Sequence, residues 1–257
     1  MPAIAGLPGW RHEHFQTIGS TNIECLSRAE AGDEGRLWIT AAEQVAGKGR
    51  RGNHWVSETG NLYASVLLID RIWKQRVTTL PFVAALAAHD AIGRAAEVGH
   101  PDLSIKWPND ILWQRRKLAG ILLERTPFGD QQAAIVVGFG INCTHSPSGT
   151  PYPTTSIREM GRDVSADDLL PHLAKAFAET LAVWEQPNGF EVVRSDWLNR
   201  ASGLGEKISV RLPAETLTGI FHTIDSEGQL QLFMDNKTRS ISAGEVFFPR
   251  MMEEGAG

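Results

Sequence analysis

The chain has 257 residues, of which 42% are hydrophobic and 21% charged, and its formal net charge is −5. These values are ordinary for a folded globular protein and exclude a disordered chain. The acidic balance gives no electrostatic reason to expect binding to nucleic acid or to an anionic membrane. The two cysteines, Cys25 and Cys143, lack metal-type spacing, and the apolar runs are too short to span a bilayer. We therefore expect a protein of the reducing cytoplasm, with no membrane partner.

Helical and strand-like patterns alternate through most of the chain. Polar helix-start residues followed by apolar residues at helical spacing predict a helix over 20–31, and an alanine-rich stretch predicts a buried helix over 80–97. An apolar stripe predicts a helix over 170–184 that covers a sheet face, and another helix is expected over 190–200. β-rich segments predict strands over 36–44, 61–70, 103–107, 110–114, 117–124 and 133–142.

The pattern changes after Gly203 and Gly205. Four short β runs follow, over 207–212, 215–224, 230–233 and 238–242. Because none of these segments is long enough for a helix, they predict a small β-barrel. We therefore predict an α+β chain with one domain over residues 1–202 and a β module over 203–257.

A glycine-rich basic loop, Gly47-Lys48-Gly49-Arg50-Arg51-Gly52, follows the strand that ends near Gln44. Glycines let a backbone approach a ligand closely, and clustered cations repel one another unless an anion screens them. Phosphate is the natural guest of such a loop. The loop matches neither a Walker A motif nor a dinucleotide-binding motif, and a solvated hairpin tip is the plain alternative.

A second informative segment is Lys106-Trp107-Pro108-Asn109-Asp110. The proline ends the strand, so Asn109 and Asp110 are expected at a turn, where they can meet a ligand or a magnesium ion. An ordinary turn is the alternative. Lys117 opens an apolar strand that closes on small residues, which leaves room for a substrate beside its ammonium group.

A third segment, Val136 to Asn142, is an apolar strand that carries Gly138 and Gly140. Glycines in a strand mark the close approach of a ligand or of another part of the backbone. Packing against a helix is the alternative.

These segments, together with Ser20-Thr21-Asn22, resemble the catalytic domain of biotin protein ligases. The resemblance rests on S-T-N, G-K-G-R-R-G followed by Trp, K-W-P-N-D, K-L-A-G-I-L and G-F-G-I-N, which occur here in the family order. It implies a mixed, largely antiparallel sheet covered by helices, as in class II synthetases. The C-terminal β module is similar to the family's SH3-like domain.

The resemblance implies that biotin is first activated by ATP and Mg²⁺ as biotinyl-5'-AMP. Biotin then passes to a lysine of a biotin carboxyl carrier domain, the implied partner. Lys117 and Arg50 match the catalytic cations, and Asp110 is the expected magnesium contact. The implied biotin site comprises Ser20, Thr21, Asn22, Gln44, Gly47, Lys48, Gly49, Arg50, Lys117, Gly120 and Gly138. The implied ATP and adenylate site comprises Arg50, Arg51, Trp55, Lys106, Asn109, Lys117 and Asn142.

Two positions depart from the family pattern. Lys48 replaces the usual arginine, and Asn53 with His54 replaces a usual basic pair. The resemblance therefore does not carry the family's bidentate phosphate contacts over to these positions. We also expect the segment 46–55 to be mobile until biotin or its adenylate binds.

Three other functions compete with this interpretation, and the acidic balance disfavours one of them, nucleic-acid binding by the basic loop. Lipoate ligases share the catalytic fold, and a nucleotide-binding regulator would need the basic loop without catalysis. The 19 residues before Ser20 are too few for a helix-turn-helix domain, which predicts a monofunctional ligase without a nucleic-acid partner. A homodimer through an exposed sheet edge is left open.

Overall fold

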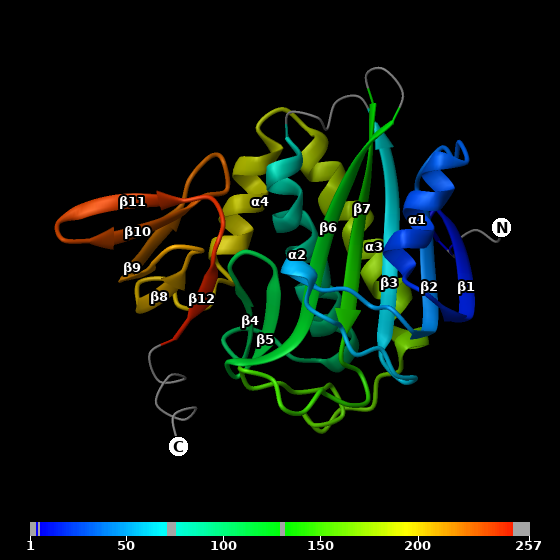
Figure 1. Cartoon of the computed structure of the whole chain (residues 1–257), viewed down its shortest axis with the longest axis horizontal. Coiled ribbons are helices and arrows are strands. Elements are labelled where there is room, and N and C mark those ends of the chain that lie inside the picture. Colours follow the sequence, from blue (N-terminus) through cyan, green and yellow to red (C-terminus); the bar gives the residue numbers. More distant parts are fainter. Residues whose placement is uncertain (1–3, 5, 71–75, 129–131, 249–257) are drawn as a thin grey trace.

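The structure is a computed structural model that describes residues 4, 6–70, 76–128 and 132–248 (Figure 1). Its larger sheet has seven strands, in the order β1-β2-β3-β7-β6-β5-β4. The pair β1 and β2 is parallel and the other neighbours are antiparallel, which confirms the predicted mixed, largely antiparallel sheet. The strands are β1 (Arg11–Ile18), β2 (Leu37–Gln44), β3 (Leu62–Asp70), β4 (Leu103–Lys106), β5 (Asp110–Trp113), β6 (Arg116–Phe128) and β7 (Gln132–Ile141).

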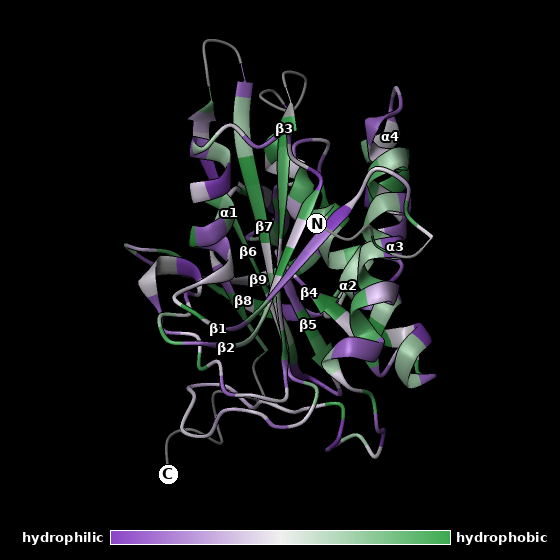
Figure 2. Cartoon of the chain, turned by 90° about the vertical axis from the view of Figure 1, so that its right-hand side faces the viewer, coloured by the Kyte–Doolittle hydropathy of each residue, from purple (hydrophilic) through white to green (hydrophobic). Residues whose placement is uncertain are grey.

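Helices cover both faces of this sheet. The helices are α1 (Thr21–Glu30), α2 (Leu80–Ala96), α3 (Ala166–Glu185) and α4 (Gly189–Leu198). Figure 2 shows α1 alone on one face and the other three on the opposite face. The alanine-rich α2 packs closely between the sheet and α3, since many of its side chains are small and most are buried. None of the helices in the described ranges is long and apolar enough to cross a membrane.

The C-terminal strands form a second, antiparallel sheet in the order β11-β10-β9-β8-β12. They are β8 (Lys207–Arg211), β9 (Thr216–Ile224), β10 (Leu230–Met234), β11 (Lys237–Ile241) and β12 (Glu245–Phe247). Buried and exposed residues alternate along β9, as expected for a sheet with one face toward a core. The indole of Trp107 donates to the carbonyl of Gly228 (3.3 Å), so this sheet is fastened to the larger domain. The domain boundary at residue 203 stays a prediction.

Three elements differ from the sequence prediction. The edge strand β1 was not predicted, because its polar residues do not alternate with apolar ones over RHEHFQTI. The short strand β12 was also missed. α3 begins earlier than predicted, at a capping box formed by Ser165 and Asp168. Asp110 is the first residue of β5, while Asn109 lies in the turn before it.

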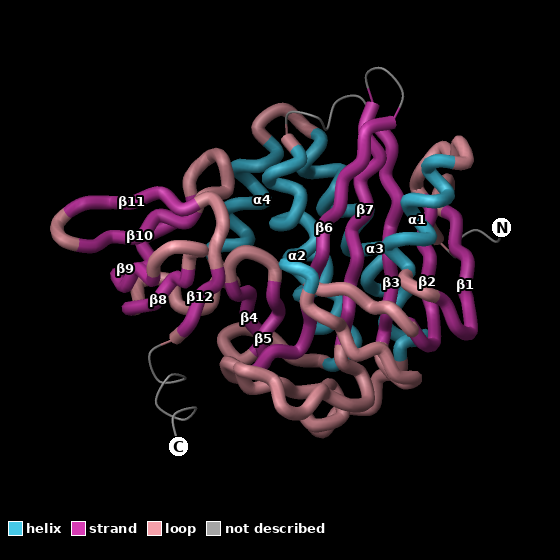
Figure 3. Tube along the Cα trace, in the orientation of Figure 1, coloured by secondary structure: helices cyan, strands magenta, loops and turns pink. Residues whose placement is uncertain are grey.

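The long loops gather at one end of the larger sheet (Figure 3). The segment that joins β2 to β3 instead crosses the front of the sheet in Figure 1, on the side of α1. This segment contains the basic loop, including the short 3₁₀ helix η1 (Arg50–Gly52). The basic loop is thereby placed over the strands that carry Lys117 and the paired glycines.

Candidate active site

A pocket lies on the α1 face of the larger sheet, beneath the basic loop. Its open space, counted together with the solvent-filled mouth, is about 910 Å³. The predicted residues that line it are Ser20, Thr21, Asn22, Gln44, Lys48, Gly49, Arg50, Trp55, Asn109, Asp110, Lys117, Gly120 and Gly138. These predicted residues come from five separate segments of the chain.

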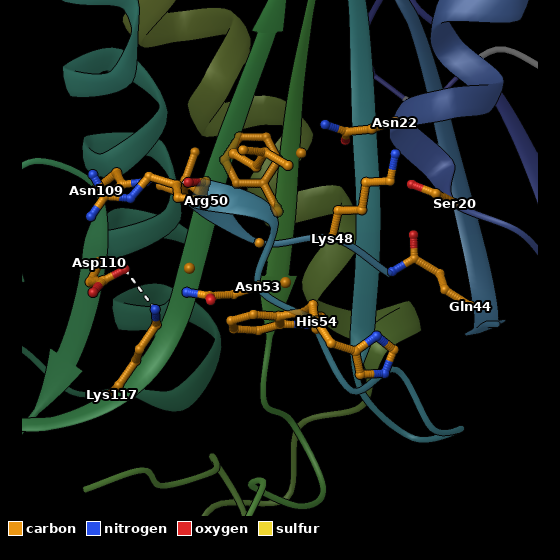
Figure 4. Close-up of a pocket in the computed structure, with 18 of the residues that line it drawn as sticks. Ser20, Asn22, Gln44, Lys48, Arg50, Asn53, His54, Asn109, Asp110 and Lys117 are labelled. Atoms are coloured by element: carbon orange, nitrogen blue, oxygen red, sulfur yellow. Dashed lines mark hydrogen bonds and ion pairs between the residues drawn. The ribbon is translucent and has the colours of Figure 1, made fainter. Parts of the chain in front are cut away.

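Uncharged hydrogen-bonding groups of the sheet and of α1 line one end of the pocket, and Figure 4 shows Lys48 of the basic loop beside them. Ser20 is the residue before α1, and its hydroxyl does not cap the helix. Both the backbone N–H and the hydroxyl of Thr21 donate to Oε1 of Gln44, at 2.8 and 3.1 Å. Uncharged donors and acceptors of this kind suit a neutral polar ligand rather than an ion.

The other end holds a buried cluster of charge. Asp110 lies between two ammonium groups, 2.9 Å from Nζ of Lys117 and 3.2 Å from Nζ of Lys106. Burial alone would raise the pKa of Asp110, but Lys117, Lys106 and Arg50 together hold that pKa well below its usual value. Burial likewise acts to lower the pKa of Lys117, and Asp110 raises it overall. Lys117 is therefore a buried but charged cation.

Asn109 presents an unused acceptor to the pocket. Its amide nitrogen donates to the carbonyl of Ile121, whereas its Oδ1 is buried without a hydrogen-bond partner among the described residues. A buried acceptor that lacks a donor is costly, so this oxygen is poised to receive an N–H group of a ligand.

Two aromatic rings flank Lys117. Its Nζ lies 5.2 Å from the ring centroid of Tyr152 and 5.4 Å from that of Trp55. The ring of Trp55 also covers the backbone of Gly140, where a Cβ atom would lie only 2.5 Å from the indole. Tyr152 is a pocket residue that the sequence analysis missed, because it lies in an irregular loop with no motif around it. The backbone N–H of Lys117 donates to the carbonyl of Pro153, which fastens this loop beside the lysine.

The basic loop closes on itself above the pocket. The N–H of Gly49 donates to the carbonyl of Asn53 (2.7 Å), and the N–H of Trp55 donates to that of Gly47 (3.0 Å). Figure 4 shows the side chain of Arg50 reaching toward Asn109. The side chain of Arg51 lies outside the described part of the structure.

Several predicted residues do not line the pocket. Lys106 forms an ion pair with Asp110, and a Cβ atom at Gly47 would clash with the carbonyl of Trp55, so Gly47 makes room for the loop's own backbone. Asn142 is buried and donates to the carbonyl of Thr155 (3.0 Å).

Gly138 has two roles: it lines the pocket, and it makes room for the amide of Asn22, which a Cβ atom would approach to 2.1 Å.

The described residues do not form a magnesium site of their own. Both carboxylate oxygens of Asp110 are engaged by lysines, and no three His, Cys, Asp or Glu side chains of the described chain come together as a metal-binding group. Mg²⁺ prefers oxygen ligands in octahedral geometry. In this conformation Asp110 does not fit the predicted role of metal contact.

The fold and the pocket match one class of enzymes. Residues 16–142 match the Biotin/lipoate A/B protein ligase family, and residues 203–248 match the Biotin protein ligase C terminal domain. The chain is 40% identical to a biotin–[acetyl-CoA-carboxylase] ligase of Paracoccus denitrificans, covering 89% of this chain and 97% of that protein. It is 31% identical to the ligase of the same name from Mycobacterium tuberculosis, over 93% of this chain and 89% of the relative.

A solved structure gives the same result. The biotin protein ligase of Aquifex aeolicus in complex with biotin and ATP superimposes with a TM-score of 0.79 at 25% identity, covering 92% of this chain and 97% of that one. The chain belongs to the biotin protein ligase family, and it is an enzyme of the ligase class.

Proposed function

We propose that this enzyme joins biotin and ATP to form biotinyl-5'-AMP and then transfers biotin to a lysine of a biotin carboxyl carrier domain. In the first step a carboxylate oxygen of biotin attacks the α-phosphorus of ATP, and pyrophosphate leaves. In the second step the lysine amine attacks the acyl carbon, AMP leaves, and the amide nitrogen loses a proton. The observation that supports this most directly is a pocket with an uncharged end beside a buried, charged Lys117.

The charges of the pocket suit the first step. Bringing a carboxylate onto a triphosphate is opposed by Coulomb repulsion, which fixed cations offset. Lys117 and Arg50 both line the pocket, with the basic loop above them. We assign Lys117 as the main catalytic cation and Arg50 as the second.

The uncharged end suits the ring of biotin. A cyclic urea carries one carbonyl acceptor and two N–H donors, and no charge. Ser20, Thr21, Asn22 and Gln44 offer hydroxyl and amide groups of both kinds. The nucleotide then lies toward Trp55 and Asn109, where stacking and the free acceptor of Asn109 are available to a base.

Magnesium enters this proposal as part of the MgATP substrate. Mg²⁺ commonly binds through substrate phosphates and water rather than a complete protein cage. That behaviour agrees with a pocket whose one well-buried carboxylate, Asp110, is held by two lysines. We also propose a cytoplasmic location, in keeping with the free thiols of Cys25 and Cys143.

The test is intact-mass spectrometry of a carrier domain incubated with the enzyme, ATP and biotin. We expect one biotin per carrier domain, and none when ATP is omitted or the acceptor lysine is replaced by arginine. The same assay with lipoate in place of biotin distinguishes a biotin ligase from a lipoate ligase. Transfer of lipoate without transfer of biotin would refute the proposal.

A homodimer stays a prediction. β1 is an edge strand that pairs with β2 on one side, and strand edges readily pair with a second chain. Sedimentation velocity with and without biotin measures the oligomeric state directly.

A further inference from the structure

A chain of hydrogen bonds runs along the uncharged end of the pocket and ends outside it, at Glu124 on β6. Nδ2 of Asn22 donates to Oε2 of Glu124 at 2.7 Å. The hydroxyl of Ser65 on β3 lies 2.5 Å from Oδ1 of Asn22 and 2.7 Å from Oγ1 of Thr21. Neither Ser65 nor Glu124 was identified from the sequence, since neither belongs to a motif that carries the family resemblance.

The chain continues from Thr21 to the basic loop. The backbone N–H of Thr21 donates to Oε1 of Gln44 (2.8 Å), whose Nε2 donates to the hydroxyl of Ser57 (3.0 Å). That hydroxyl in turn donates to the carbonyl of Trp55 (2.9 Å). The pocket residues Asn22 and Gln44 are thus held within one network between β6 and the loop.

Both ends of this network are groups that only accept hydrogen bonds. The carbonyl of Trp55 fixes the hydroxyl of Ser57 as a donor, which turns Nε2 of Gln44 toward Ser57 and Oε1 toward Thr21. An ionised carboxylate at Glu124 likewise fixes the amide of Asn22 with its NH₂ toward β6 and its oxygen toward Ser65. An asparagine amide is nearly symmetric in shape, so its neighbours decide which way it faces.

Glu124 has no competing ionic role in the described part of the chain. The salt bridges in that part of the chain are formed by other carboxylates, such as Asp110. The side chain of Glu124 instead accepts the hydrogen bond from Asn22. Asn22 itself is 5% exposed, and its amide lies directly against the backbone of Gly138. The orientation of this buried amide is therefore decided by Glu124 and Ser65.

We propose that Glu124 is a positioning residue for recognition of the cyclic urea, acting through the amide of Asn22. The proposal rests on the proposed function. A urea needs donors toward its carbonyl and acceptors toward its N–H groups, so a reversed Asn22 amide would present the wrong atom to the ring. Glu124 lies outside the pocket and away from the cluster of Asp110 and Lys117, so it should affect biotin binding and leave the chemical step alone.

The experiment compares Glu124→Gln with wild type. Glutamine keeps the shape but can donate as well as accept, so it no longer fixes the Asn22 amide. We expect the KM for biotin to rise on the order of 10-fold, the effect of losing one well-oriented hydrogen bond. The KM for desthiobiotin, which keeps the urea, should rise by the same factor, while kcat at saturating biotin and the KM for ATP stay within about twofold.

Two controls make the result specific. Glu43→Gln makes the same chemical change at an exposed position on β2 and should leave every constant unchanged. In an Asn22→Ala background, Glu124→Gln should have no further effect, because the residue through which it acts is gone. Thermal melting of each variant reports whether the fold is retained.

An unchanged KM for biotin in Glu124→Gln would overturn the positioning role. Equal rises in the constants for biotin and ATP would do the same, and so would additive effects in the Asn22→Ala background. Failure of the proposed function is a distinct result, since the wild-type enzyme itself would then form no biotinyl-5'-AMP.

Discussion

Nζ of Lys117 lies 2.9 Å from Oδ1 of Asp110, and this buried ion pair sits at the charged end of the pocket. The carboxylate keeps the ammonium charged in a place where burial would otherwise favour its neutral form. The lysine is thus held in its cationic state before any substrate arrives, as a preorganised site requires.

Replacing Lys117 should therefore slow activation of biotin. We expect Lys117→Met to lower the rate of biotinyl-5'-AMP formation by on the order of 10²-fold or more, because a preorganised charge is lost from the transition state. Release of pyrophosphate in single-turnover experiments measures this. Lys175→Met, at an exposed position on α3, is the matched control and should retain the wild-type rate. A wild-type rate in Lys117→Met would show that the ammonium has no catalytic role.

Asp110 should contribute to stability in a pH-dependent way. Its pKa is lower in the folded chain than in the unfolded one, so its contribution is full above the unfolded value near 4 and is lost as the pH falls through the folded value. At pH 7 we expect Asp110→Asn to lower the free energy of unfolding by about 3–5 kcal/mol, because two buried ammonium groups lose their partner.

Urea denaturation of wild type and Asp110→Asn at pH 7 and at pH 3 tests this. The difference between the two proteins should narrow at pH 3, since Asp110 is then protonated in the unfolded wild type but still ionised in the folded one, and proton uptake on unfolding reduces the stability that the carboxylate contributes. Asp196→Asn, at an exposed position on α4, should behave as wild type at both pH values. A difference that grows in acid would contradict the assigned ion pair.

Tyr152 should help to hold ATP at the charged end of the pocket. Its ring centroid lies 5.2 Å from Nζ of Lys117 and 5.7 Å from that of Lys106, so it covers both ammonium groups. We expect Tyr152→Ala to raise the KM for ATP by on the order of 10-fold, as these contacts are lost and water enters. Tyr152→Phe keeps the ring and should retain most of the affinity. If the alanine variant binds ATP normally, the ring has no such role.

The basic loop should become protected when ligand binds. Its cations lie close together, and the loop's backbone bonds are local, such as the one from Gly49 to Asn53. A bound adenylate would screen the repulsion between Lys48 and Arg50. We expect trypsin to cleave after Arg50 more slowly with biotin and ATP present, while cleavage after Lys237 in the C-terminal sheet is unchanged. Equal cleavage of the loop in both conditions would contradict the prediction.

Local patterns in the sequence were enough to predict most elements of this fold. Apolar residues at helical spacing indicate α1 and the later part of α3, and the small side chains of α2 indicate a buried helix. The strand β1 was missed because it lies at a sheet edge and carries polar residues on both faces. Its place beside β2 depends on a parallel pairing across the intervening helix, which no local pattern records.

The candidate site divides in the same way. Ser20, Arg50 and Lys117 each belong to a short motif of consecutive residues. The residue types within these motifs are sufficient to assign the family and to select the candidate site residues. The pairing of Lys117 with Asp110 and the link from Asn22 to Glu124 join residues on different elements. Such contacts depend on strand register and on how α1 packs over the sheet, because a one-residue shift would turn each side chain to the opposite face.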